Sequence, residues 1–119
     1  MSDYQTYEAR LKTSLWVEGH VRTCFTADMP AFVVAKGDAD RGGVLLKINQ
    51  FSAGISLYEQ TLDFDGNKMW RSAGNFDAAA ERDSDAAIAK KRQYDSDLWV
   101  IEIEDNAQAY QLDAPFSEF

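Results

Sequence analysis

Acidic side chains gather around one strongly apolar segment near the carboxyl end of the chain. Glu102 and Glu104 are two residues apart, so in a strand they project from the same face, and Asp97 and Asp105 flank them. Hard divalent cations prefer carboxylate oxygens, and metal-dependent hydrolases use such groups. Asp97, Glu102, Glu104 and Asp105 are therefore the candidate metal ligands of this sequence.

The same carboxylates also have a structural explanation. Nucleases that pair carboxylates normally place a lysine beside them to stabilise the transition state, whereas Asp105 and Asn106 follow Glu104 here. The alternative is the exposed end of a strand whose carboxylates pair with cations such as Lys36 or Lys47. We favour this alternative and expect neither a bound metal nor a cofactor.

Two shorter motifs are incomplete versions of known sites. His20 and Cys24 are four residues apart on a predicted helix, which is half of a zinc site or a cysteine–histidine pair, but the chain has one histidine and one cysteine. We therefore expect a buried Cys24 and a half-exposed His20. Residues 38–43 begin like a calcium loop, yet Asn49 stands where the closing glutamate belongs, so a hairpin turn explains them better.

The aromatic and basic residues also have structural explanations. Trp16, Trp70 and Trp99 could form a stacking platform, but in a small domain tryptophans chiefly build the core, and we expect Trp99 to be buried. The basic run at residues 90–92 is typical of the last turn of a helix, where it complements the dipole.

The hydropathy pattern predicts the elements that position these side chains. Residues 31–35 and 98–101 are apolar on both faces, which is typical of strands at the centre of a covered sheet. The glycine-rich segment 37–43 predicts a hairpin from 31–35 to 44–49. Strands at 44–49, 55–60 and around 69–71 predict an antiparallel meander, and 98–104 is expected to pair with 109–112.

Two helices complete the prediction. A short strand at 11–13 leads into a helix capped by Ser14 and ended by residues 28–30, and a second helix runs from about Asp83 to Tyr94. The first helix carries an apolar stripe. Its expected members are Val17, Val21, Cys24 and Phe25.

This order predicts a small three-layer α/β/α sandwich, a mixed sheet of about six or seven short strands with a helix on each face. The alternative is a two-layer α+β fold with both helices on one face, which would expose Trp99 or its neighbours. The 119 residues, 45% of them apolar, suit one domain over residues 1–119, with 1–9 as a loose N-terminal segment.

Composition limits the partners and the compartment. A net charge of -8 opposes binding to the phosphate backbone, so we expect no nucleic-acid partner. The chain has a single cysteine, no signal-like start and no apolar run of about 20 residues, which predicts a cytoplasmic protein without a membrane segment.

Several blocks of sequence are distinctive: Arg10-Leu11-Lys12, Leu15-Trp16-Val17, and residues 30–34, 37–38, 44–49 and 95–105. Together they resemble a small alphaproteobacterial family known only as a domain of unknown function (family 1491). The resemblance spans Arg10 to about Leu112, and Ser96 stands where the family is expected often to have proline. It implies a single cytoplasmic domain and fits the sandwich, but it implies no activity, cofactor or catalytic residue.

These observations favour a non-enzymatic accessory or protein-interaction domain, with a metal-dependent hydrolase built on Glu102 and Glu104 as the alternative. An open sheet leaves edges unpaired, so we expect a protein partner or a weak homo-oligomer to pair with one edge. The candidate is the strand containing Met69, Trp70 and Arg71. The competing arrangement has that edge guarded by charge and Trp70 turned inward.

Overall fold

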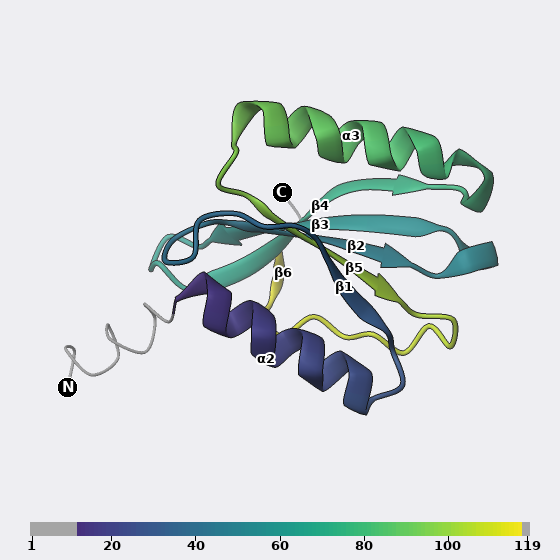
Figure 1. The fold of residues 1–119 in the computed structure, drawn as a ribbon, viewed down its shortest axis with the longest axis horizontal. Helices are drawn as coiled ribbons and strands as arrows, with labels where there is room; N and C mark the ends of the chain where they lie inside the picture. The colour runs from purple at the N-terminus through teal and green to yellow at the C-terminus, as the bar shows by residue number, and fades with distance from the viewer. Residues whose placement is uncertain (1–11, 118–119) are drawn as a thin grey trace.

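A mixed sheet flanked by two helices forms the body of the protein (Figure 1). The computed structural model describes residues 12–117, and the predicted loose segment 1–9 lies outside them. The strands are β1 (Ala31–Ala35), β2 (Val44–Asn49), β3 (Ile55–Leu62), β4 (Lys68–Phe76), β5 (Trp99–Glu104) and β6 (Phe116–Ser117). Five strands of five to nine residues make up the sheet, and the two-residue β6 extends it beside β4. The predicted mixed α/β fold is confirmed.

The strand order is β1-β5-β2-β3-β4-β6. The pairs β2–β5 and β4–β6 are parallel, and the other neighbours are antiparallel. This order confirms the meander of β2, β3 and β4 and the central position of the segment that begins at Leu98. None of the helices within residues 12–117 is long and apolar enough to cross a membrane.

Helices α2 (Thr13–Thr26) and α3 (Glu81–Tyr94) lie on opposite sides of the sheet in Figure 1. The alternation of side chains along the strands explains why both are needed. Leu46 of β2 packs in one apolar cluster with Val17 of α2, whereas its neighbour Leu45 packs in a second cluster with Ile88 of α3. Two short 3₁₀ turns also lie along the chain: η1 (Phe51–Ala53) between β2 and β3, and η2 (Ala78–Ala80) between β4 and α3.

The first helix begins earlier than predicted. Thr13 is helical rather than part of a strand, and Ser14 is not the N-cap, because Lys12 occupies that position without a side-chain cap. The Thr13 hydroxyl instead donates to the carbonyl oxygen of Gly42 at 2.7 Å, which fixes the start of α2 against the loop before β2. Phe25, predicted to be buried, is 52% exposed at the far end of the helix.

The predicted hairpin between residues 31–35 and 44–49 is wrong, because β5 inserts between β1 and β2. The glycines of the loop between β1 and β2 do not form a tight turn. They leave room for the backbone that leads into β5. A Cβ atom at Gly37 or Gly42 would clash with the carbonyl oxygen of Asp97, just before β5, and the Asp38 N–H donates to that oxygen at 3.0 Å. β1 is therefore an edge strand, not a central one.

The expected strand at residues 109–112 is also absent from the structure, since β6 follows later and pairs with β4. The carboxylate of Asp105 accepts the backbone N–H groups of Ala109 and Tyr110, at 2.8 and 3.0 Å. These donors are therefore satisfied by a side chain instead of a neighbouring strand.

Candidate functional site

The acidic metal candidates point to separate partners. Glu102 lies 3.4 Å from Lys47 Nζ and accepts from Asn49 Nδ2 at 3.3 Å, and Asp105 is fully buried among backbone donors. Asp97 lies in the turn before β5, and Glu104 ends that strand. Within residues 12–117, no three His, Cys, Asp or Glu residues lie together in a way that could hold a metal ion. The structure therefore gives no support to a metal-dependent hydrolase built on these residues.

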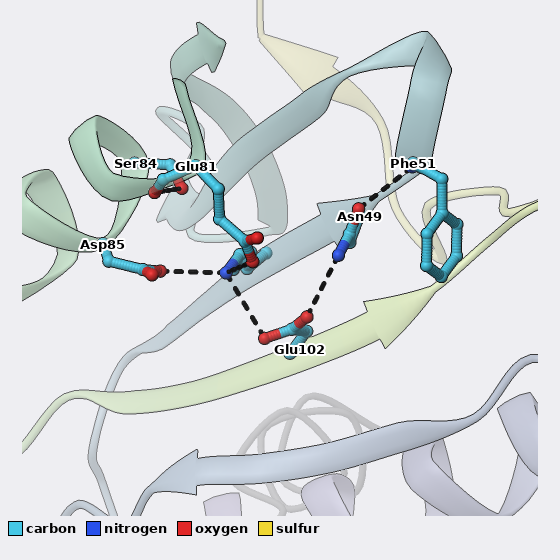
Figure 2. A network of polar contacts seen from close by, with 7 residues as sticks. Asn49, Phe51, Glu81, Ser84, Asp85 and Glu102 are labelled. Carbon is cyan, nitrogen blue, oxygen red and sulfur yellow. Dashed lines mark hydrogen bonds and ion pairs between the residues drawn. The ribbon is translucent and has the colours of Figure 1, made fainter. Parts of the chain in front are cut away.

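Lys47, one of the two cations predicted to pair with these carboxylates, is buried beside Glu102. Lys47 is 3% exposed, and its Nζ lies 2.7 Å from Glu81 Oε2 and 2.8 Å from Asp85 Oδ1. Figure 2 shows Glu81 and Asp85 of α3 and Glu102 of β5 pointing toward one position, where they meet this ammonium group. Lys47 is directly opposite Glu102 in the β2–β5 register, which confirms the predicted strand pairing of this carboxylate.

The electrostatics of this network identify it as structural. Burial by itself would lower the pKa of Lys47, but hydrogen bonds to Asp85 and Glu81 and the charge of Glu102 raise that pKa above its ordinary value. An amine held protonated in this way is a poor general base or nucleophile at neutral pH. Glu81 and Asp85 are one helical turn apart, which is the sequence signal that sequence reasoning missed.

His20 makes its side-chain contacts with Trp16 and Tyr110. The His20 ring stacks on Trp16 with centroids 4.5 Å apart, and its Nε2 shares a 2.7 Å hydrogen bond with the Tyr110 hydroxyl. Burial lowers the pKa of His20 and raises the pKa of Cys24, which is 2% exposed. Both shifts oppose a thiolate–imidazolium pair. The exposures confirm the predicted buried Cys24 and half-exposed His20.

The tryptophans are held by structural hydrogen bonds. Asp113 accepts from Trp16 Nε1 at 3.0 Å, from Trp70 Nε1 at 2.8 Å and from Lys68 Nζ at 2.8 Å. We call these four residues the Asp113 clasp. Trp99, 7% exposed as predicted, donates its indole N–H to a backbone oxygen in the turn at residues 38–41. These contacts fit a role in the core better than a stacking platform.

The predicted interaction strand lies beside this clasp. Trp70 has no exposed surface, Met69 is half-buried, and Arg71 pairs with Glu59 at 3.1 Å. β6 pairs with β4 at Trp70 and Arg71. The structure thus places Trp70 inward and a short strand along this part of β4.

Three consecutive exposed apolar side chains lie at the opposite edge of the sheet, on β1. Phe32, Val33 and Val34 are 47%, 39% and 56% exposed, although the sequence predicted a central strand. Phe25 of α2 contacts Phe32 edge to face, with ring centroids 6.4 Å apart. We define the edge surface as Phe25, Phe32, Val33 and Val34 with the open side of β1.

A groove of about 720 Å³ runs beside the edge surface, between α2 and β1. Val17, Val21 and Trp99 form its apolar floor, and Val33 connects it to the open edge. Glu18 and Arg22 of α2 line it as charged groups, and neither forms an ion pair within residues 12–117. Further lining residues are Ser14, Phe25 and Lys36.

Within residues 12–117, the backbone of β1 has no partner strand on its outer side. The Glu104 N–H donates to the Pro30 oxygen at 2.8 Å, which sets the phase of the antiparallel ladder. By the alternation of the ladder, Phe32, opposite Glu102, faces β5 with its N–H and C=O, and the corresponding groups of Ala31 and Val33 are the outward ones. The register shifts between Val33 and Ala35. An apolar open strand beside a groove can accept another extended chain.

Comparisons with known proteins agree with this fold. The family model described as "Protein of unknown function (DUF1491)" matches residues 11–113. A crystal structure of a DUF1491 family protein from Caulobacter crescentus CB15 is 30% identical, has a TM-score of 0.80, and aligns over 90% of this chain and 99% of that one. An NMR structure of a DUF1491 family protein from the same organism is 30% identical, has a TM-score of 0.77, and aligns over 92% of this chain and 98% of that one.

Protein Atu0922 from A. tumefaciens is similar in fold. Its solution structure has a TM-score of 0.67 at 24% identity, over 80% of this chain and 86% of that one. The curated proteins give no match to this chain. Neither the family description nor these structures names a substrate or a partner.

Proposed function

The chain belongs to the DUF1491 family, whose description assigns no activity, and we propose that it is a non-enzymatic protein-interaction domain that binds an extended segment at β1. The exposure of Phe32, Val33 and Val34 on an edge strand carries this proposal. Natural proteins usually protect a sheet edge with charge or proline, and such an apolar edge is typical of a binding surface.

The mode of binding follows from the groups that β1 presents. The outward N–H and C=O groups of Ala31 and Val33 supply the main-chain hydrogen bonds of strand addition. Side chains of the bound segment would alternate between the groove under α2 and the opposite face near Val34. We therefore expect the bound segment to be extended and apolar at alternating positions.

A random peptide library displayed on phage, selected on dilute protein, tests this function. We expect selected peptides to shift the amide resonances of residues 31–35 and to slow exchange of the Val33 N–H. Val33→Pro removes that outward donor without removing a bond to β5, so it should abolish peptide binding. Val33→Thr keeps the donor and is the matched control. Peptides that bind Val33→Pro as well as the parent protein would refute strand addition at β1.

We also infer the finer features of the prediction. The two apolar clusters, one with α2 and one with α3, support a three-layer α/β/α sandwich over a single domain. The single cysteine and the net charge of -8 support a cytoplasmic protein that does not bind nucleic acid. A thermal scan with added duplex DNA and with vesicles of anionic lipid should show no change in melting temperature.

A further inference from the structure

We propose that the segment bound at β1 is the β1 strand of a second copy of this chain, paired antiparallel about a two-fold axis. This inference rests on the proposed interaction role of the edge surface and names its partner. A two-fold arrangement requires that one patch complement itself. Three features of the edge surface meet that requirement.

The first feature is the backbone register. When Ala31 lies opposite Val33 of the second copy, all outward N–H and C=O groups of these two residues find partners. Phe32 then lies opposite Phe32 of the second copy at the two-fold axis. Both faces of the joined strands are apolar, so an identical strand fits as well as any other apolar sequence.

The second feature is the charge of the groove. Glu18 and Arg22 are one helical turn apart on α2 and make no ion pair within the described part of the chain. A two-fold axis perpendicular to the sheet places the two α2 helices antiparallel on the same face. Glu18 of each copy then faces Arg22 of the other, which gives two ion pairs from one patch.

The third feature is closure. The other end of the sheet is β6, which has two residues, and so short an edge strand resists further pairing. Pairing of β1 with β1 uses the edge at that end of the sheet, whereas β6 covers β4 only at Trp70 and Arg71. The β1–β1 contact uses the same patch on both copies, so it joins two copies and does not itself extend into a fibre.

A charge-swap experiment on the full chain tests this arrangement by sedimentation equilibrium. Glu18→Arg and Arg22→Glu each replace two ion pairs with two like-charge contacts, so each variant alone should dimerise about tenfold more weakly than the parent protein. In a mixture of the two variants, each introduced charge faces its opposite. We expect the mixture to form heterodimers with the affinity of the parent protein.

Matched controls separate this geometry from net charge. Asp83→Arg and Arg82→Glu make the same changes in charge on an exposed part of α3, and their mixture should show no preference for heterodimers. Val33→Pro should abolish dimerisation and Val33→Thr should not. A monomeric parent protein that still binds selected peptides at residues 31–35 would overturn the second copy and keep the proposed function. A dimer that Val33→Pro leaves intact, or a mixture without heterodimers, would overturn this interface.

Discussion

Asp105 shows how one carboxylate can replace a strand. It is fully buried, and it accepts from Gln50 Nε2 at 2.9 Å as well as from the backbone of Ala109 and Tyr110. Burial alone would raise the pKa of Asp105, but these hydrogen bonds outweigh it and hold that pKa below the ordinary value. Its contribution to stability is therefore present above the pKa of the unfolded chain, near 4, and is lost as the pH falls.

We expect Asp105→Asn to lower the free energy of unfolding by about 1–3 kcal/mol at pH 7, because an amide nitrogen then faces backbone donors. The variant should also lose less stability than the parent protein below about pH 4, since it lacks the titrating group. Urea unfolding between pH 3 and pH 7 measures both effects. Asp65→Asn, in an exposed loop, is the control, and an equal loss there would contradict this role of Asp105.

A second prediction at the scale of single residues concerns Lys47. Lys47→Met leaves Glu102, whose side chain is 20% exposed, without its cation, whereas Glu81 and Asp85 at 48% and 57% can return to water. We therefore expect a loss of about 1–3 kcal/mol, less than for a fully buried pair. Adding Glu102→Leu should recover part of this loss in urea unfolding, since no buried charge then remains at this position.

Lys90→Met is the matched control for this substitution, because Lys90 is an exposed cation on α3, the helix that carries Glu81 and Asp85. It should change stability by about 0.5 kcal/mol or less. The raised pKa of Lys47 means that its contribution is present below the unfolded value near 10 and is lost only at more alkaline pH. A loss between pH 6 and pH 8 would therefore have another cause.

At the scale of elements, the Asp113 clasp holds the segment between β5 and β6. Asp113 accepts from two tryptophans and Lys68, and these hydrogen bonds outweigh burial and keep its pKa below the ordinary value. Asp113→Ala would leave the Trp70 indole N–H buried without a partner. We expect a loss of about 1–3 kcal/mol, a change in tryptophan fluorescence, and faster proteolysis within residues 106–117.

The control for the clasp is Asp77→Ala, which removes an exposed carboxylate before η2 that forms no ion pair within residues 12–117. It should leave both fluorescence and the pattern of proteolysis unchanged. If Asp113→Ala is cut no faster than this control, other contacts hold the segment, and the clasp contributes only local hydrogen bonds.

The sequence largely predicted which residues form helices and strands, but it did not predict which strands lie beside one another. Residues 31–35 form the strand that their apolar pattern predicts, but five apolar residues look the same in a central strand and at an exposed binding edge. Whether β5 or β2 lies beside β1 depends on long-range pairing. Gly37 and Gly42 allow β5 to lie beside β1, because a Cβ atom at either position would clash with the Asp97 carbonyl oxygen. Local turn rules do not describe such a long-range contact.

The same limit applies to the candidate sites. The strand position of Lys47 allowed its pairing with Glu102 to be predicted, because alternation places both side chains on one face. Glu81 and Asp85 reach Lys47 only after α3 packs on the sheet. Sequence reasoning therefore found the acidic residues of β5 but not the helix that completes their network.

At the scale of the whole molecule, net charge opposes the proposed dimer. Each copy carries -8, and extents of 48 × 33 × 27 Å place two centres roughly 30 Å apart across β1. In water without salt, the repulsion of two such charges at about 30 Å is about 9 kcal/mol. Screening lengths of about 30 Å at 0.01 M and about 8 Å at 0.15 M ionic strength reduce it to about 3 and about 0.2 kcal/mol.

Salt should therefore tighten the dimer. The two exposed Glu18–Arg22 pairs contribute only about 0.2–1 kcal/mol each, so their screening cannot offset the relief of about 3 kcal/mol in repulsion. We expect the dissociation constant to fall by roughly a hundredfold between 0.01 and 0.15 M sodium chloride. Sedimentation equilibrium at several salt concentrations measures this slope. A dissociation constant that rises with salt would mean that local ion pairs, rather than the apolar edge, hold the two copies together.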